Sequence, residues 1–596
     1  MNLGTLAVRI SAKKNAHAPL LLVFLAVFVL AVPAPAQQSS PRTSAEIKTP
    51  SSPARPKLVV ILVVDQMRGD YIDRFQHQWS GGLKRLVNEG AWFHDAAYPY
   101  ANTETCVGHA TISTGALPAT HGLVTNEWWD REQQKEVTCT SDPAVKNIPY
   151  ASTAAAAPAP PSSPGDSAAR MLVPSFADEL KFQGGAGSRI VTMSLKARAA
   201  ITLAGHQGDA VTWFDGATGG WITSSAYPQV PFIAEFVKAH PVAADFGKTW
   251  TPLLPDSEYM YEKIAAGADP PPGYGAAFPH PLRGTAVSKG PDPAFYFQWA
   301  TSPFAETYLA QMAEAAVDQL RLGQGAATDF LGVSFSSVDY VGHTFGPGSW
   351  ELQDELARLD RDLAVFFAHL DKTVGRGNYV VAFSADHGVA PIPEELRKIG
   401  IDAGRLNLAE VKSRIEQALN PFHYAKPSVA DVGGADVYFT PDTYSKLKAD
   451  LRALQAVLDA IQGVPGVLKV YQSEEVEGRP ATQNPIRSAE AAGFFKRRSG
   501  DLLIVPKPYW IWDYSQPGTP VRGGTSHGSP YYYDQRVPVL LMGWGIRPGE
   551  YFESATPADI AVTLATLCGI TLAVSDGRTL REALDASGAA ANPARQ

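Results

Sequence analysis

Short apolar runs rich in β-branched residues recur along the chain and predict the strands of a buried sheet. The first spans Lys57 to Val64 and ends directly on Asp65. Because helices cover both faces of a parallel sheet, its strands are apolar throughout and do not alternate. Similar runs follow at Arg189 to Leu195, Asp329 to Phe335, Asn378 to Phe383, Asp501 to Val505 and Val537 to Met542. Together these runs predict one mostly parallel sheet.

Helical patterns lie between the apolar runs. The clearest is Trp350 to Asp371, where apolar residues step by three and four and form a single stripe. A second runs from Thr556 to Leu567, with Thr556 as the N-cap and Pro557 at the first helical position. A third is Thr443 to Ile461. Strands that alternate with helices predict an α/β fold, a doubly wound sheet flanked by helices.

The N-terminal segment has the pattern of an export signal. Three basic residues precede the apolar run Leu20 to Val32, and Ala34 to Ala36 supplies the small residues that a signal peptidase requires. The run has 13 residues, fewer than the roughly 20 of a spanning helix, so a membrane anchor is the weaker alternative. We predict a signal peptide over 1–36, no membrane span after its cleavage, and a periplasmic or secreted protein.

The rest of the chain divides into a linker, one folded domain and a tail. Residues 37–56 are rich in Ser, Pro and Thr and predict a flexible linker. The predicted domain covers 57–585, with cap insertions at about 205–300 and 410–500. The first insertion is rich in aromatic residues, Gly and Pro and could form a lid over a site. Residues 586–596 predict a disordered tail.

Composition narrows the classes of function. With 45% hydrophobic residues the chain can bury a large core, and 51 basic against 59 acidic residues give no overall attraction for a nucleic acid. Three cysteines are too few for a disulfide scaffold or a metal-binding cysteine cluster. In an oxidising compartment Cys106 and Cys139 could pair and leave Cys568 free, but the sequence does not establish this connectivity.

Carboxylates and imidazoles follow several of the predicted strands. In an open parallel sheet, ligands bind beyond the carboxyl ends of the strands, so residues at these positions are candidates for a site. Three Asp and three His qualify, the last of them in a glycine-rich loop: Asp65, Asp339, His343, Asp386, His387 and His527. Both residue types bind zinc, and six ligands suffice for two three-ligand sites that each stay open to substrate. Any one of them alone would more often be a cap, a turn residue or a structural histidine.

A hydroxyl and an amide are candidates for chemistry at phosphorus. Thr105 lies where the sequence predicts the first turn of a helix, whose free backbone N–H groups favour a phosphoryl group. Thr105 could instead be only an N-cap. Asn126 could donate to a phosphoryl oxygen, although it also fits an ordinary turn. Other hydroxyls compete for the role of nucleophile, namely Thr103, Thr111, Ser113 and Thr114.

Lys196 and Arg198 follow the strand predicted at 189–195. If the extended geometry persists past the strand, a spacing of two places both cations on one face, where they could bind a dianion. The alternative is two solvated charges after a strand.

This ordered set of residues resembles the alkaline phosphatase superfamily, whose members use two zinc ions and a Ser or Thr nucleophile. The matching motifs span most of the mature chain: Asp65, Thr105, Asn126, Asp339-x3-His343, Asp386-His387-Gly388 and His527. The Lys196-x-Arg198 pair is similar to that of the bacterial alkaline phosphatases of the PafA type, neighbours of the nucleotide pyrophosphatase/phosphodiesterases.

The resemblance implies a role for each of these residues. Asp339, His343 and His527 would bind one zinc ion. The second zinc ion would be bound by Asp65, Asp386 and His387, beside Thr105. Asn126, Lys196 and Arg198 would hold the phosphoryl oxygens.

The implied function is hydrolysis of small phosphate monoesters through a covalent phosphothreonine at Thr105. A monoester presents a dianion with three non-bridging oxygens, which two cations and an amide can match, whereas a diester carries one charge. One alternative is a nucleotide phosphodiesterase or pyrophosphatase on the same two-zinc site. Another is a secreted phosphate-binding protein without turnover. We expect a monomer with no stable nucleic-acid partner.

Overall fold

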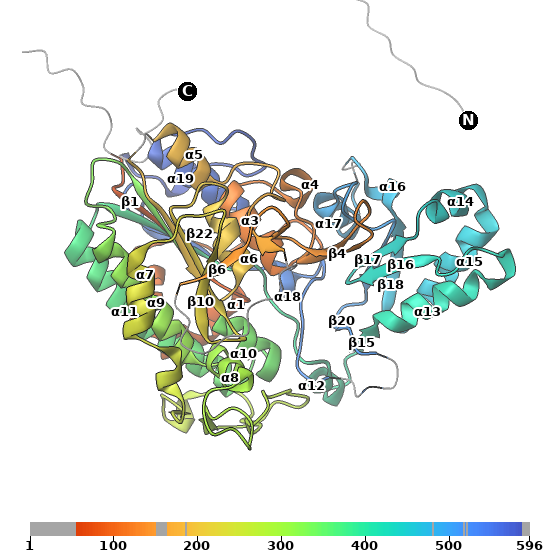
Figure 1. Ribbon diagram of the computed structural model, residues 1–596, viewed down its shortest axis with the longest axis horizontal. Helices are drawn as coiled ribbons and strands as arrows, with labels where there is room; N and C mark the ends of the chain where they lie inside the picture. Colours follow the sequence, from red (N-terminus) through yellow and green to blue (C-terminus); the bar gives the residue numbers. More distant parts are fainter. Residues whose placement is uncertain are drawn as a thin grey trace, which may run out of the picture. The chain divides into compact units, whose positions relative to one another are not determined.

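A ten-stranded sheet forms the centre of the protein (Figure 1). The computed structural model describes residues 55–150, 164–184, 187–478, 482–516, 519 and 522–586. In spatial order the strands are β22 (Gly549–Tyr551), β2 (Ala91–Phe93), β21 (Val539–Gly543), β14 (Tyr379–Ser384), β1 (Leu58–Val64), β13 (Asp329–Phe335), β8 (Ile190–Ser194), β9 (Ala210–Asp215), β10 (Gly220–Ser224) and β6 (Asn147–Pro149). The predicted signal peptide, almost all of the linker and the tail from residue 587 lie outside the described residues.

The middle of the sheet is parallel, as the apolar runs predict. β14, β1, β13, β8 and β9 all run in the same direction. β21 differs from the prediction, because it is antiparallel to both of its neighbours, β14 and β2. β10 pairs antiparallel with β9, so the start of the first predicted insertion extends the sheet as a hairpin.

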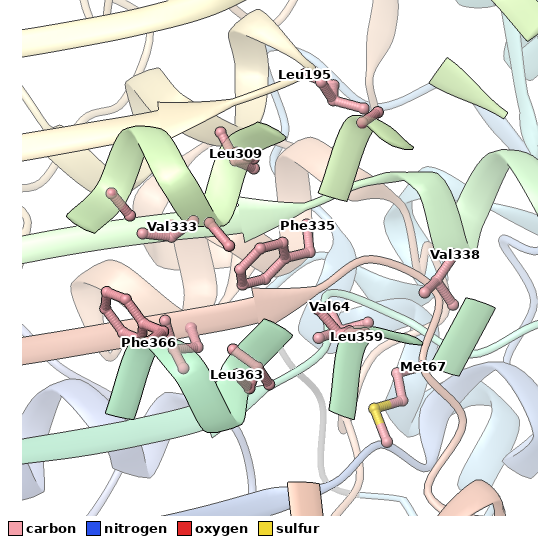
Figure 2. Packing of buried hydrophobic residues seen from close by; sticks show 14 of the residues in the cluster. Val64, Met67, Leu195, Leu309, Val333, Phe335, Val338, Leu359, Leu363 and Phe366 are labelled. Carbon is pink, nitrogen blue, oxygen red and sulfur yellow. The ribbon is translucent and has the colours of Figure 1, made fainter. Parts of the chain in front are cut away.

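Helices cover both faces of the sheet, and alternate residues of β1 belong to two separate cores. Leu62 and Val64 lie in the core that includes α9 (Pro303–Gln319) and α11 (Trp350–Leu370). Figure 2 shows this core, with side chains of β13 packed between those of the two helices. Ile61 and its alternate neighbours lie in the core with α5 (Phe176–Gln183) and α19 (Ala558–Cys568). The doubly wound α/β prediction is thus confirmed.

The predicted helices are present, with two differences. α11 spans nearly all of its predicted range. α19 begins at Ala558 with Pro557 as its N-cap, so Thr556 is not the N-cap; the Asp559 carboxylate in the first turn accepts the Thr556 N–H, at 2.9 Å. The stretch predicted at 443–461 is broken into α14 (Thr443–Ala449) and α15 (Leu451–Gln462). The Asp450 carboxylate accepts N–H groups of the first turn of α15 and so starts a new helix.

A second, smaller sheet lies within the later part of the chain. Its order is β16 (Val429–Gly433), β17 (Asp436–Phe439), β19 (Leu502–Pro506) and β18 (Val467–Gln472), all antiparallel. It shares a core with α13 (Leu408–Ala418) and α15. The run 501–505 was predicted for the main sheet, but it forms β19. β19 is buried throughout, as the central strands of the main sheet are, so its apolar character alone does not reveal to which sheet it belongs.

The middle of the first predicted insertion contacts α11. Its short pair β11 (Thr249–Trp250) and β12 (His280–Pro281) contributes two buried polar contacts to that helix. The Trp250 Nε1–H donates to Asp354, at 2.6 Å, and His280 Nε2 lies 2.9 Å from a Glu351 oxygen. Among the described residues, no helix has both the length and the apolar character to cross a bilayer.

Candidate active site

Adjacent parallel strands carry the candidate site residues to one edge of the sheet. Asp65 follows β1, and Asp386 and His387 follow β14. Asp339 and His343 lie on α10 (Ser337–Phe345), which follows β13. Because β14, β1 and β13 are neighbours, the side chains at their carboxyl ends converge.

The first group that could hold a metal ion is Asp339, His343 and His527. Their ligand atoms all lie within 4.8 Å of one another. His343 Nδ1 lies 2.8 Å from the Thr525 carbonyl oxygen, and His527 Nδ1 lies 2.7 Å from that of Thr103. Because a carbonyl only accepts, each Nδ1 carries the proton and each Nε2 presents its lone pair. The sequence predicts this trio, and the structure brings it together.

The second group contains a residue that the sequence analysis missed. Asp65, His109 and Asp386 place their ligand atoms within 4.8 Å of one another. The sequence places His387 here instead of His109. His387 is also close, with Nε2 3.2 Å from an Asp386 oxygen and 3.5 Å from Thr105 Oγ1. Its Nδ1 donates to the Gly388 carbonyl, at 2.9 Å, so Nε2 again faces the site.

His109 connects the nucleophile candidate to Asp65. Its Nδ1 donates to the Thr105 carbonyl, at 2.8 Å, and its Nε2 lies 2.9 Å from the Ser334 hydroxyl. That hydroxyl in turn donates to Asp65, at 2.7 Å. His109 lies inside a helix and not after a strand, so the search of strand ends passes over it. Its only sequence signal is that it lies four residues after Thr105, on the same helix face.

A buried lysine balances the carboxylates. Lys196 Nζ lies 2.9 Å from Asp65 Oδ2 and 2.6 Å from Asp339 Oδ2. Burial alone would raise the pKa of Asp339 and lower that of Lys196. Their mutual attraction outweighs burial, so the pKa of Asp339 is held well below its usual value and the pKa of Lys196 is raised. Burial would also raise the pKa of Asp65, but Lys196 and His109 lower it below its usual value. All three groups are therefore charged inside the protein.

Two stacked imidazoles differ in their preference for a proton. The rings of His387 and His527 are 3.5 Å apart. Burial acts to lower the pKa of His387, but the Asp386 carboxylate raises it to about 9. Burial and repulsion from His387 and His343 hold the pKa of His527 well below its usual value. The second ring stays neutral because two adjacent cations would repel each other.

Gln66 joins the two groups, and the sequence analysis did not identify it. Its backbone N–H donates to Asp386, at 2.9 Å, and its side-chain amide donates to Asp339, at 2.7 Å. Gln66 adopts a left-handed conformation, with φ of 65°. Gly342 leaves room for its side chain, because a Cβ at Gly342 would lie 2.0 Å from Gln66 Oε1. An unusual backbone conformation at this point is consistent with a functional site.

Thr105 is buried and is the first residue of α3 (Thr105–Thr114), as predicted. The helix approaches the end of β14 closely at Gly108, where a Cβ would lie 2.0 Å from the Asp386 carbonyl oxygen. Glycine is therefore required there for Thr105 to lie beside the carboxylates.

Asn126 is held in one orientation beside α3. Its backbone N–H donates to Glu104, at 2.6 Å, and its side-chain oxygen accepts the Cys106 N–H, at 2.9 Å. The amide NH₂ group is thus left for a ligand. Cys106 forms a disulfide with Cys139, and Cys568 is free, so the pairing that the sequence left open is established.

The predicted geometry of Lys196 and Arg198 is wrong, although both reach the site. α6 (Ala197–Ala204) begins between them, so the extended conformation does not continue. Lys196 is directed to the buried carboxylates. Arg198 lines a pocket of about 240 Å³ together with Asn126 and His527. No residue of the insertion predicted at 205–300 lines this pocket.

Several known proteins are similar to this chain in sequence and in fold. A family model described as type I phosphodiesterase / nucleotide pyrophosphatase matches residues 59–530. The alkaline phosphatase PhoV of Synechococcus elongatus is 34% identical over 87% of this chain and 91% of its own length. The alkaline phosphatase PafA of Elizabethkingia meningoseptica is 35% identical over 87% of this chain and 92% of its own. A crystal structure of PafA, at 33% identity, superposes with a TM-score of 0.79 and covers 90% of this chain and 100% of that one.

A solved variant of PafA superposes on this chain with a TM-score of 0.80. The four residue types that were replaced in it are those of four candidate residues of this chain. It is substituted at a threonine, an asparagine, a lysine and an arginine. The first two are separated as Thr105 and Asn126 are, and the last two as Lys196 and Arg198 are. The chain therefore belongs to the type I phosphodiesterase / nucleotide pyrophosphatase family, on the branch of the bacterial alkaline phosphatases.

Proposed function

We propose that the protein is an exported, zinc-dependent alkaline phosphatase that hydrolyses phosphate monoesters through a phosphothreonine at Thr105. The observation that carries the proposal is the position of this hydroxyl, buried at the start of a helix and 3.5 Å from His387 Nε2, beside two groups of metal-binding side chains. The 33–35% identity to alkaline phosphatases over most of the chain supports it.

The residues present fit zinc. Their donors are carboxylate oxygens and imidazole Nε2 atoms, and Asp386 Oδ2 is buried without a hydrogen-bond partner among the described residues. We assign Asp339, His343 and His527 to one ion and Asp65, Asp386, His387 and Thr105 to the other. When bound, the two ions would lower the pKa of the Thr105 hydroxyl and neutralise charge that develops on the leaving oxygen. His109 acts on Thr105 and Asp65 as a positioning residue.

The reaction has two displacements at phosphorus. In the first, Thr105 Oγ forms a bond to phosphorus while the ester P–O bond breaks, and the leaving alcohol takes up a proton. In the second, a water oxygen bonds to phosphorus, the Thr105–phosphorus bond breaks, and phosphate leaves. Each time the transition state spreads charge over the equatorial phosphoryl oxygens.

The chain's own donors recognise those oxygens. The Asn126 amide and the Arg198 guanidinium line the pocket, and Lys196, which pairs with Asp65 and Asp339, supplies a second positive charge beside the metal-binding groups. Two cations and an amide match the dianion of a monoester better than the single charge of a diester. Preference for monoesters is therefore an electrostatic property of these side chains.

The test measures zinc content and the ratio of kcat/KM for p-nitrophenyl phosphate to that for bis-p-nitrophenyl phosphate, on purified mature protein. We expect two zinc ions per chain and a ratio far above one. The double variant Lys196→Ala/Arg198→Ala should lose much more monoesterase than diesterase activity, and equal losses would refute the charge argument. Thr105→Ala should retain its zinc and lose both activities, and full turnover by this variant would exclude Thr105 as the nucleophile.

A nucleotide phosphodiesterase is the second candidate, because the family model carries that description. It would keep two zinc ions but invert the ratio. A phosphate-binding protein without turnover would bind zinc and phosphate and hydrolyse neither ester.

A further inference from the structure

The pocket that Asn126 and Arg198 line is also acidic. Its lining includes Glu104, which accepts the Asn126 backbone N–H. It also includes Glu127 and Glu136, which belong to the hairpin of β3 (Glu127–Asp130) and β4 (Lys135–Thr138). A substrate whose phosphoryl group is held by Asn126 and Arg198 would therefore share this pocket with the two carboxylates of the hairpin.

The two glutamates face each other across the hairpin. Glu127 pairs with Thr138, and Trp129 pairs with Glu136, so Glu127 and Glu136 are diagonal neighbours on one face. Burial raises the pKa of Glu136, and the neighbouring carboxylates of Glu127 and Asp431 raise it further. Within the described residues, neither glutamate has a Lys or Arg partner within 4.0 Å. A pair of like charges without a counter-ion costs stability, which indicates a role other than holding the hairpin together.

An aromatic ring also lines this pocket. The lining includes Tyr514, Gly433 at the end of β16, and Gly434 in the turn between β16 and β17. Gly434 has φ of 56°, and a Cβ there would point to within 3.7 Å of the Tyr514 hydroxyl and 3.9 Å of a Glu104 oxygen. The backbone turn thus leaves the carboxylates and the aromatic ring open to a ligand. Carboxylates beside an aromatic ring suit an alkylammonium group.

We propose that Glu127 and Glu136 are specificity-determining residues that favour phosphate monoesters with an alkylammonium leaving group and disfavour those with an anionic one. The inference rests on the proposed function, because it concerns the same pocket. Lys196 and Arg198 attract the dianionic end of the substrate, while the two glutamates attract a cation a few bonds further out. Charge of opposite sign at the two ends fixes the direction in which such a substrate enters.

The test compares phosphocholine with its neutral isostere 3,3-dimethylbutyl phosphate. Wild type should show a kcat/KM ratio of roughly five in favour of phosphocholine at low salt, as expected for partly screened charges about 5 Å apart. The ratio should fall toward one in Glu127→Gln/Glu136→Gln and also at high ionic strength. Glu132→Gln is the matched control, because Glu132 is exposed on the same hairpin but does not line the pocket.

Two results would overturn the inference. A wild-type ratio of one or less, with p-nitrophenyl phosphate still hydrolysed, would refute the specificity role alone. A ratio that stays the same in the double variant, or falls equally in Glu132→Gln, would do so too. Failure to hydrolyse p-nitrophenyl phosphate as well would refute the proposed function and this inference together.

Discussion

At the scale of single residues, Gln66 fixes the positions of Asp386 and Asp339 relative to each other. It supports Asp386 through its backbone N–H and Asp339 through its side chain. Such partners of a metal ligand typically change metal affinity by about 10–100-fold. We expect Gln66→Gly to lower zinc affinity by about that factor, since glycine keeps the left-handed backbone without the amide. Competition with a chelator measures it. Gln78→Ala, in the short 3₁₀ helix that follows α1 (Asp70–Phe75), is the control, and an unchanged affinity in Gln66→Gly would contradict the prediction.

The candidate site could be predicted where chemistry follows a strand. Asp65 comes directly after a buried run and Asp386 lies two residues after another, so a search of strand ends finds both. Gln66 lies at the same strand end as Asp65, but a glutamine there does not by itself indicate a site, and His109 does not follow a strand. Gln66 acts through a left-handed backbone, and His109 acts from inside a helix through bonds to Thr105 and Ser334. These roles depend on contacts between distant segments, which residue type and spacing do not reveal.

At the scale of elements, the sequence likewise does not reveal which distant strands pair. β19 and β21 were both predicted from apolar character, and both exist. Apolar character reports burial, but it reports neither the partner strand nor the direction. β19 therefore lies in a different sheet from the predicted one, and β21 runs antiparallel. The central parallel strands were predictable because their connections through helices leave few other arrangements.

The helix α3 and the hairpin of β3 and β4 are also joined covalently. The Cys106–Cys139 disulfide closes a loop with a sequence separation of 33. Loop-closure entropy gives it about 4 kcal/mol of stability. We expect Cys106→Ala/Cys139→Ala to lose free energy of unfolding of about that size in guanidinium titrations. Reductant should bring wild type close to this variant. Cys568→Ala is the control, because Cys568 is buried but free, and it should keep its sensitivity to reductant.

At the scale of the whole molecule, buried acidic side chains occur both beside the main sheet and on the later helix α17 (Pro485–Gly493). Glu306, on α9 beside the main sheet, has its pKa raised to about 8 by burial. Glu490, on α17, has its pKa raised to about 8 by burial and by Asp436. In the unfolded chain such groups release their protons near pH 4.5, whereas the folded protein holds them until about pH 8. Each therefore makes the fold less stable as the pH rises between these values.

Glu490→Gln isolates one of these groups, because the amide matches the protonated acid in shape but does not ionise. Below about pH 4.5 both states of the wild type hold the proton, so the substitution should leave the free energy of unfolding nearly unchanged. From pH 4.5 to 8 the variant should gain on wild type, reaching at least about 1 kcal/mol, and above pH 8 the difference should level off. Urea unfolding at pH 4, 6 and 8.5 measures this, with the exposed Glu553→Gln as the control. A gain that is the same at every pH would show that packing, and not the buried charge, is responsible.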